Sequence, residues 1–173
     1  EVNLTSVQYI DAGAASFLSA LPADAVRIAD IGCGSGWISN RAPPMRQVIG
    51  IDIDADITQR ITRRSEVGIL PNLPLKDAQV DLVLCTDVIE HLSPAEVKSA
   101  GEEFDRISRR YVYLQTPSRE RLVDGERKCS FCGERWHVNH HLASYDAAEL
   151  AAVMPAGWYL HTVTYTGEAW LVD

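Results

Sequence analysis

The sequence lacks the features that mark secreted and membrane proteins. Of the four cysteines, Cys33 and Cys85 lie isolated in apolar stretches, and the spacing of Cys129 and Cys132 suits a metal better than a disulfide framework. A chain of this length can bury a stable core without disulfides. No uncharged apolar run approaches the roughly 18 residues that a membrane-spanning helix requires. The first residues, EVNLTSVQYI, lack the basic and apolar regions of a secretory signal. We therefore expect a soluble, cytoplasmic protein with no membrane partner.

Positive charge is also scarce. Sixteen Lys and Arg stand against 24 Asp and Glu, so the net charge is −8. A surface with this balance repels a phosphate backbone, which excludes DNA as a partner and disfavours RNA. The remaining composition, 46% hydrophobic and 23% charged, is that of an ordinary globular protein. Residues 1–173 are therefore predicted to form a single domain.

Short apolar runs alternate with amphipathic segments along the chain. Helices are predicted at residues 6–21, 55–65, 93–109 and 145–154, and buried strands at residues 27–32, 47–54, 80–86 and 111–116. The tail, residues 159–173, has two β-rich arms broken at Thr166-Gly167, which predicts a hairpin. The alternation predicts an α/β fold: a Rossmann-like, doubly wound, mostly parallel sheet in three layers, with a C-terminal antiparallel hairpin.

A glycine-rich turn, ADIGCGSGW, follows the first predicted strand. In open α/β sheets this turn lines the ligand crevice at the carboxyl ends of the strands. Gly32, Gly34 and Gly36 let backbone amides approach a ligand, and Asp30 can hold an ammonium group or organise the loop. Asp52 ends the second strand, where a carboxylate can accept hydrogen bonds from both hydroxyls of a ribose. The spacing predicts a site for an adenosine-type ligand.

Trp37 argues against a dinucleotide in this site. The dinucleotide fingerprint G-x-G-x-x-G requires a third small residue at position 37, so that the helix can pack closely on the strand. An indole is too large for that packing, and NAD and FAD are therefore disfavoured.

Five motifs follow one another along the chain: ADIGCGSG, GIDID, LPLKDAQVDLVLCTDVIEHL, LQTPS and HLASYDAAEL. In this order they resemble the class I S-adenosylmethionine-dependent methyltransferases, especially the small-molecule branch that includes the ubiquinone-biosynthesis type. The resemblance covers nearly the whole chain from Arg27 to Trp158. It implies S-adenosylmethionine as the cofactor, with its methionine part held by Asp30 and the glycines. The implied cofactor-binding residues are Asp30, Gly32, Cys33, Gly34, Gly36, Asp52, Ile53, Ile69, Leu70, Asp87 and Val88.

Two places depart from the family pattern. Members commonly carry an Asp for the adenine amino group, in a Gly-Asp-Ala sequence, where this chain has Gly68-Ile69-Leu70. Either the adenine rests on Ile69 and Leu70, with backbone amides supplying the hydrogen bonds, or the adenine site is weakened. A Pro-Gly-Gly turn before the fifth strand is also missing, which should affect the topology little.

The segment at residues 117–142 fits none of the predicted elements and contains KCSFCGERWHVNHHL. The spacing Cys-x2-Cys-x4-His-x3-His supplies two thiolates and two imidazoles, an adequate tetrahedral set for a structural zinc in a zinc-knuckle-like insert. His140 is an alternative fourth ligand, and a reduced cysteine pair beside histidines that touch substrate or solvent is the alternative to a metal. The predicted zinc ligands are Cys129, Cys132, His137 and His141.

Transfer of a methyl group from a sulfonium depends mainly on holding the acceptor in line with the methyl. Where the acceptor is a poor nucleophile, a base near the carboxyl edge of the sheet can take its proton. His91, His140 and Tyr145 are the candidate catalytic residues. We predict methyl transfer to a small-molecule acceptor, as O- or N-methylation in a biosynthetic pathway. The alternatives are a methyltransferase acting on a protein or tRNA, and a non-catalytic S-adenosylmethionine-binding interaction module.

Overall fold

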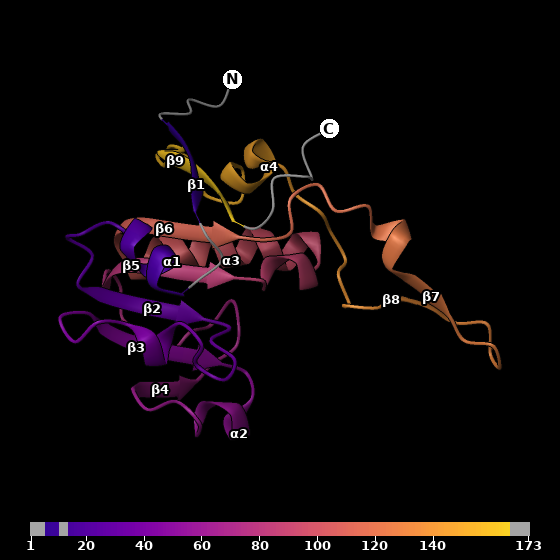
Figure 1. Ribbon diagram of the computed structural model, residues 1–173, viewed down its shortest axis with the longest axis horizontal. Helices are drawn as coiled ribbons and strands as arrows, with labels where there is room; N and C mark the ends of the chain where they lie inside the picture. The colour runs from indigo at the N-terminus through magenta and orange to yellow at the C-terminus, as the bar shows by residue number, and fades with distance from the viewer. Residues whose placement is uncertain (1–5, 11–13, 167–173) are drawn as a thin grey trace.

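A parallel sheet of five strands forms the centre of the computed structural model, which describes residues 6–10 and 14–166 (Figure 1). The strand order is β4-β3-β2-β5-β6, and each neighbouring pair is parallel. The order reverses between β2 and β5, and a ligand crevice is expected beyond the carboxyl ends of the strands at such a point. The strands are β2 (Arg27–Ile31), β3 (Gln47–Asp52), β4 (Arg64–Val67), β5 (Val80–Thr86) and β6 (Ser108–Gln115).

Helices cover both faces of this sheet because successive side chains of each strand point to opposite sides. In β5, Leu82 and Leu84 pack with Phe17 of α1 (Ala14–Ala20) on one face. Val83 and Cys85 pack on the other face with Phe104 of α3 (Pro94–Ile107). Ser93 caps α3 and shares a capping box with Glu96, as its Ser-Pro-Ala-Glu sequence favours. The predicted three-layer, Rossmann-like fold is confirmed.

Two predicted helices are wrong in part. The first five residues of the expected helix at residues 6–21 form β1 (Ser6–Ile10), which pairs in parallel with β9 (Thr162–Thr166), and α1 is the helical part of the described residues in this range. The expected helix at residues 55–65 ends early as α2 (Ala55–Thr58), and the chain then forms the edge strand β4. β1 pairs with β9 from the other end of the chain, and β4 pairs with its neighbour β3. In both places strand pairing overrides a weak helical pattern.

The remaining elements belong to the C-terminal third. An antiparallel hairpin is formed there by β7 (Glu126–Lys128) and β8 (Arg135–His137), and it extends away from the sheet in Figure 1. The second arm of the hairpin predicted at Thr166-Gly167 lies outside the described residues. η3 (Leu122–Gly125), a short 3-10 turn, precedes the hairpin, and α4 (Ala147–Ala151) follows it. Two other 3-10 turns, η1 (Ser39–Arg41) and η2 (Ile89–His91), lie earlier in the chain. Within the described residues, no helix is long and apolar enough to cross a membrane.

Candidate functional site

The glycine loop lies at the carboxyl end of β2, beside the point where the strand order reverses. Gly32 has a φ of 68°, and a Cβ atom there would lie 2.2 Å from Cγ2 of Val88. Gly36 has a φ of 80°, and a Cβ atom there would lie 2.7 Å from Nδ2 of Asn40. Both positions therefore require glycine, for conformation and for space. The loop is built so that its backbone is the surface that a ligand meets.

Asp52 ties this loop to the end of β3. Its Oδ2 accepts a hydrogen bond from the backbone N–H of Gly34 at 2.9 Å, and its Oδ1 accepts one from the N–H of Asp54 at 3.0 Å. Each carboxylate oxygen has two lone pairs, so both oxygens can accept one further hydrogen bond. The geometry fits a carboxylate that receives the two hydroxyls of a ribose.

Asp30 is the buried acid of the site. Its side chain is 1% exposed, and Oδ2 accepts a hydrogen bond from the hydroxyl of Ser39 at 2.6 Å. The other oxygen, Oδ1, has no hydrogen-bond partner among the described residues. Burial raises the pKa of Asp30 to about 6, since the charged form is poorly solvated there. An ammonium group of a ligand would supply the missing partner and favour the charged carboxylate.

The other predicted cofactor residues divide into buried and exposed sets. Cys33 is buried beneath the loop, where burial raises the pKa of its thiol to about 12, so only its backbone can face a ligand. Ile53 and Ile69 follow the neighbouring strands β3 and β4 and are 66% and 57% exposed. Leu70 packs partly against the core. Two exposed aliphatic side chains at one sheet edge offer an apolar surface of the kind that a purine base covers.

The segment after β5 closes the site on the side of β6. Asp87 adopts a φ of 54°, and its N–H donates to the carbonyl of Gln115 at 2.9 Å, which joins the ends of the two strands. Val88 packs against Gly32, as its close approach shows. Val88 therefore lies beside the glycine loop, and Asp87 precedes it at the end of β5.

The three candidate bases lie near this segment but differ in what their side chains can reach. Nδ1 of His91 lies 3.3 Å from the carbonyl oxygen of His140, whose own side chain is exposed. The hydroxyl of Tyr145 donates to the carbonyl of Ile89 at 3.4 Å, and burial raises its pKa. The structure thus brings His91 and Tyr145 to the same loop, and His140 contributes a backbone carbonyl.

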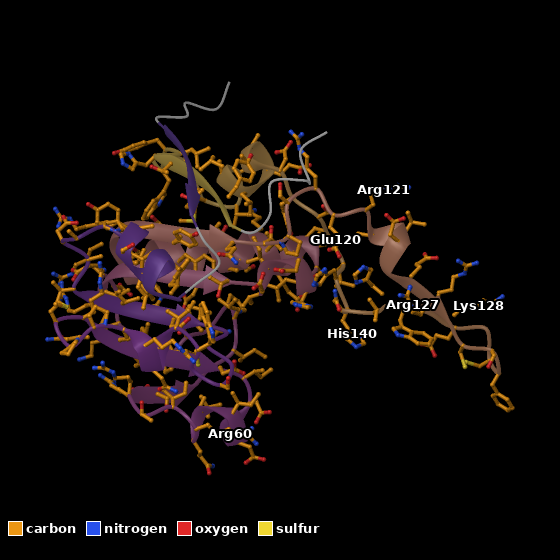
Figure 2. The ribbon with its side chains drawn as sticks, viewed as in Figure 1. Arg60, Glu120, Arg121, Arg127, Lys128 and His140 are labelled. Carbon is orange, nitrogen blue, oxygen red and sulfur yellow. The ribbon has the colours of Figure 1, made fainter. Side chains whose placement is uncertain are left out.

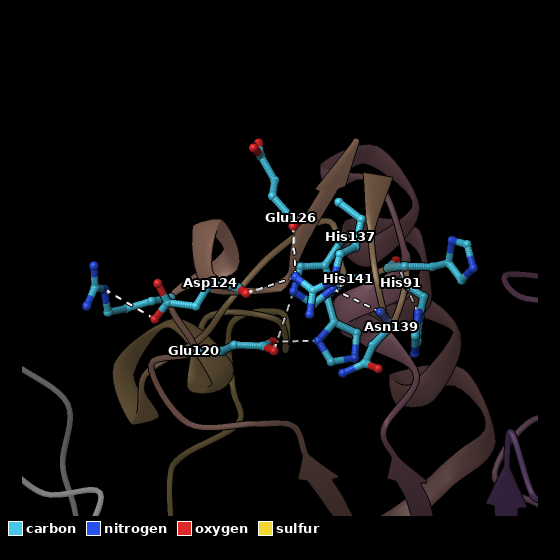
Figure 3. Close-up of polar contacts among 10 residues, drawn as sticks. His91, Glu120, Asp124, Glu126, His137, Asn139 and His141 are labelled. Carbon is cyan, nitrogen blue, oxygen red and sulfur yellow. Dashed lines mark hydrogen bonds and ion pairs between the residues drawn. The ribbon is translucent and has the colours of Figure 1, made fainter. Parts of the chain in front are cut away.

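Two glutamates that the sequence analysis missed lie in the same region. Glu90 is 1% exposed, and neither of its carboxylate oxygens has a hydrogen-bond partner among the described residues. Burial raises its pKa to about 7, with smaller contributions from the charges of Asp87 and Glu120. Glu120 lies between two histidines, 2.5 Å from Nδ1 of His141 and 3.6 Å from Nε2 of His137 (Figure 3). Glu90 could have been singled out from the sequence because it stands next to His91, a candidate site residue. The sequence around Glu120 does not distinguish it from other surface acids.

Backbone contacts explain why the insert returns to this loop. The N–H groups of Leu142 and Ala143 both donate to the carbonyl of Glu90, at 2.7 and 3.2 Å. The N–H of Arg119 donates to the carbonyl of Tyr145 at 3.0 Å, which closes the base of the insert. His141 is therefore held against His91, with ring centroids 4.9 Å apart.

The predicted zinc ligands do not form one site in this structure. Cys129 and Cys132 lie at the turn of the β7–β8 hairpin, whereas His137 pairs with Glu126 at its base. Three residues of extended chain, about 10 Å at the usual rise, separate Cys129 from the residue opposite His137. Figure 2 shows the hairpin carrying Arg127 and Lys128 away from the sheet.

Groups of potential metal ligands do occur among the described residues, but neither contains a cysteine. One consists of Glu90, His91 and His141, and the other of Glu120, His137 and His141. The predicted site with two cysteines does not form because β7 pairs with β8 in antiparallel, which separates residues that lie close together in the sequence. The backbone amides that follow Cys129 still turn toward its thiol and lower its pKa.

Comparison with protein families matches residues 29–114 to a family described as a methyltransferase domain. No curated protein matches the chain significantly. The matched residues contain the glycine loop, Asp52, and the segment from Asp87 to His91.

Three solved structures illustrate the similarity of fold. A methyltransferase from Thermotoga maritima, described as a possible histamine N-methyltransferase, is 22% identical with a TM-score of 0.62, over 82% of this chain and 69% of its own. The YcgJ protein from Bacillus subtilis is 21% identical with a TM-score of 0.60, over 81% of this chain and 64% of its own. A methyltransferase from Methanosarcina mazei is 19% identical with a TM-score of 0.60, over 79% of this chain and 81% of its own.

Several matched structures are longer than this chain. It covers 53% of a protein from Pyrococcus horikoshii and 59% of a methyltransferase from Archaeoglobus fulgidus. At these identities the structures establish the fold, and the family match establishes the domain and its cofactor, S-adenosylmethionine. The chain therefore belongs to the class I S-adenosylmethionine-dependent methyltransferases.

Proposed function

We propose that this domain transfers a methyl group from S-adenosylmethionine to a small-molecule acceptor, at an oxygen or nitrogen atom. The observation that carries the cofactor half of the proposal is the unpartnered Oδ1 of Asp30 at the end of β2. A buried carboxylate oxygen without a partner is costly, and a cationic ligand group removes that cost. The α-ammonium group of the cofactor is such a group.

Each part of the cofactor has a matching feature at this edge. Asp30 receives the ammonium group, and the amides of the glycine loop face the carboxylate and the sulfur-bearing chain. Asp52 receives the ribose hydroxyls with the accepting capacity that remains on its two oxygens. Ile53 and Ile69 give the adenine an exposed apolar surface. This apolar surface takes the place of the aspartate that relatives commonly carry near the adenine. It favours the first alternative for residues 68–70, in which the adenine rests on aliphatic side chains.

The bound cofactor supplies an electrophilic methyl group on a sulfonium. The chain's own residues position an acceptor beside Asp87 and Val88, which adjoin the glycine loop. Where the acceptor is a hydroxyl, His91 is placed to take its proton, because its Nδ1 is hydrogen-bonded to a carbonyl and its Nε2 is then the basic nitrogen. An amine acceptor that is already neutral needs no base.

Two observations support a small acceptor over RNA or protein. The net charge of −8 disfavours a polyanion. The same fold also serves small amines in proteins described as a possible histamine N-methyltransferase and as a phosphoethanolamine N-methyltransferase, from Thermotoga maritima and Haemonchus contortus. The second of these is 21% identical over 78% of this chain, with a TM-score of 0.57.

A labelling experiment tests the proposal. The protein is incubated with S-adenosylmethionine carrying a radioactive methyl group and with cell extract separated into metabolite, protein and tRNA fractions. Label is expected in the metabolite fraction, and Asp52→Ala should lower it strongly because the cofactor binds more weakly. Label in protein or tRNA alone would overturn the small-molecule acceptor. Cofactor binding without label in any fraction would favour the non-catalytic binding module.

A further inference from the structure

Glu90 is the buried group that the methyl-transfer site leaves unexplained. Its carboxylate is fully enclosed, yet neither oxygen accepts a hydrogen bond from any described residue. The carboxylates of Asp87 and Glu120 act on it as like charges. An enclosed acid with acidic neighbours and no donor is unstable unless it is protonated or compensated by a cation.

Two imidazoles stand beside Glu90. Glu90, His91 and His141 each offer one ligand atom, and these atoms lie within 4.8 Å of one another. Ligand atoms on one zinc-type ion are about 3.4 Å apart at metal–nitrogen distances of about 2.1 Å. The three ligand atoms therefore lie close to the spacing that one ion requires.

The hydrogen bonds of the two imidazoles leave the same nitrogen available on each. Nδ1 of His91 faces the carbonyl of His140 at 3.3 Å, and Nδ1 of His141 faces the carboxylate of Glu120 at 2.5 Å (Figure 3). Carbonyl and carboxylate oxygens only accept, so Nδ1 carries the proton in both rings and Nε2 has the lone pair. A carboxylate or carbonyl that fixes the ring in this way is the usual support of a metal-ligating histidine.

His137 has the opposite arrangement, which sets it apart from the site. Its Nδ1 accepts hydrogen bonds from the backbone N–H groups of Asn139 and His141, both at 3.3 Å. The proton of the neutral ring is then on Nε2, which points toward Glu120 and lies against Gly125. A protonated nitrogen cannot bind a metal, so the second group does not form a metal site in this arrangement, and Glu120 contacts Nδ1 of His141 at 2.5 Å with Nε2 of His137 3.6 Å away.

We propose that Glu90, His91 and His141 bind one divalent transition-metal ion, with Glu120 orienting His141 from behind. Two imidazoles and one carboxylate favour an ion such as Zn²⁺, Co²⁺ or Fe²⁺ over Mg²⁺, which prefers oxygen ligands. Three protein ligands leave an open position on the ion for water or for a donor atom of the acceptor. This site differs from the cysteine-containing site that the sequence spacing suggested. An ion bound to Nε2 of His91 occupies the lone pair that a general base would use, so in the metal-bound protein the ion would take the place of His91 in activating a hydroxyl acceptor.

Cobalt binding tests the site without reference to activity. The whole protein is stripped with a chelator and titrated with Co²⁺, and binding is followed by visible absorbance and by calorimetry. About one Co²⁺ per chain is expected, with bands of a nitrogen and oxygen site and no thiolate charge-transfer band, and Zn²⁺ should displace it. Glu90→Gln should weaken Co²⁺ binding by at least tenfold, and Glu120→Gln, which acts through His141, by about tenfold.

Two further variants keep the result interpretable. His91→Ala changes an exposed side chain, so it should lose the metal even if the buried Glu90→Gln does not fold. The matched control, Cys129→Ser with Cys132→Ser, should retain full Co²⁺ affinity. Two results would overturn the proposal. One is a thiolate band in the parent protein together with loss of the metal in the cysteine control. The other is Co²⁺ affinity that is unchanged in both Glu90→Gln and His91→Ala. S-adenosylhomocysteine binding measured in the stripped protein reports separately on the methyltransferase function.

Discussion

The glycine-loop edge of the sheet and the insert at residues 117–142 are stabilised in different ways. At the edge, the polar side chains are held by residues of neighbouring strand ends and the loop between them, as in the bonds from Gly34 N–H to Asp52 and from the Ser39 hydroxyl to Asp30. In the insert, the polar groups are held by side chains from separate segments, as in the contacts of Glu120 with His137 and His141. Changes at the edge should therefore alter cofactor affinity and stability strongly, and changes at the hairpin tip should leave both intact.

The largest effect is expected from Asp52→Ala. Two hydrogen bonds from ribose hydroxyls to a carboxylate are lost, and each is worth about 1.5 to 3 kcal/mol, so S-adenosylhomocysteine affinity should fall by about 100-fold or more. Calorimetric titration measures this directly. Asp56→Ala is the matched control, since Asp56 is an exposed acid nearby that contributes its backbone N–H to Asp54. Equal affinity of Asp52→Ala and the parent would remove Asp52 from the site.

Two glycines of the same loop separate steric from conformational cost. Gly32→Ala combines a positive φ with a clash at Val88, and we expect a loss of about 2 to 4 kcal/mol in the free energy of unfolding. Gly34→Ala has a positive φ with no atom within 4 Å, and about 1 kcal/mol is expected. Urea denaturation measures both. Similar losses in the two variants would show that Val88 does not pack on Gly32.

Asp30 should give the protein a pH-dependent stability. Its pKa is raised from 3.8 to about 6 by burial, so its favourable contribution is present below pH 4 and is lost as the pH rises through 6. Asp30→Asn has no such titration. The difference in unfolding free energy, variant minus parent, should therefore increase by about 2 kcal/mol between pH 4 and pH 7. A difference that stays constant across this range would contradict a raised pKa at Asp30.

The smallest effect is expected at the tip of the insert. Phe131 is 98% exposed between the two cysteines, so Phe131→Ala should change stability by less than about 0.5 kcal/mol. Cofactor affinity should also be unchanged, because the tip is far along the hairpin from the sheet (Figure 2). Thermal unfolding and calorimetry check the two statements. A clear loss of cofactor affinity would mean that the insert and the glycine loop act as one unit.

The sequence predicted the sheet well where local pattern and burial agree. The run VDLVLCT is buried along its first six residues and forms β5 with the predicted bounds, and the Ser-Pro-Ala-Glu cap begins α3. The pattern failed at residues 6–10, because their partner β9 lies at the other end of the chain and leaves no local trace. Residues 64–67 likewise become a strand only because they pair with β3.

The two candidate sites differ in the same respect. The glycine loop depends on glycines with positive φ angles, and Asp52 stands at the end of β3. Both features can be recognised from the spacing of residues along the chain. The Glu90, His91 and His141 group joins two segments about fifty residues apart through backbone bonds to the carbonyl of Glu90. Spacing instead grouped Cys129 with His137, because it contains no information about the hairpin that separates them.

Titration of the unmodified protein with S-adenosylhomocysteine tests the central claim most directly. The account predicts binding of one molecule per chain, undisturbed by an excess of NAD, because Trp37 stands where the dinucleotide fingerprint requires a small residue. Absence of S-adenosylhomocysteine binding, or its displacement by NAD at a similar concentration, would contradict the assignment of the glycine loop to the methyl donor.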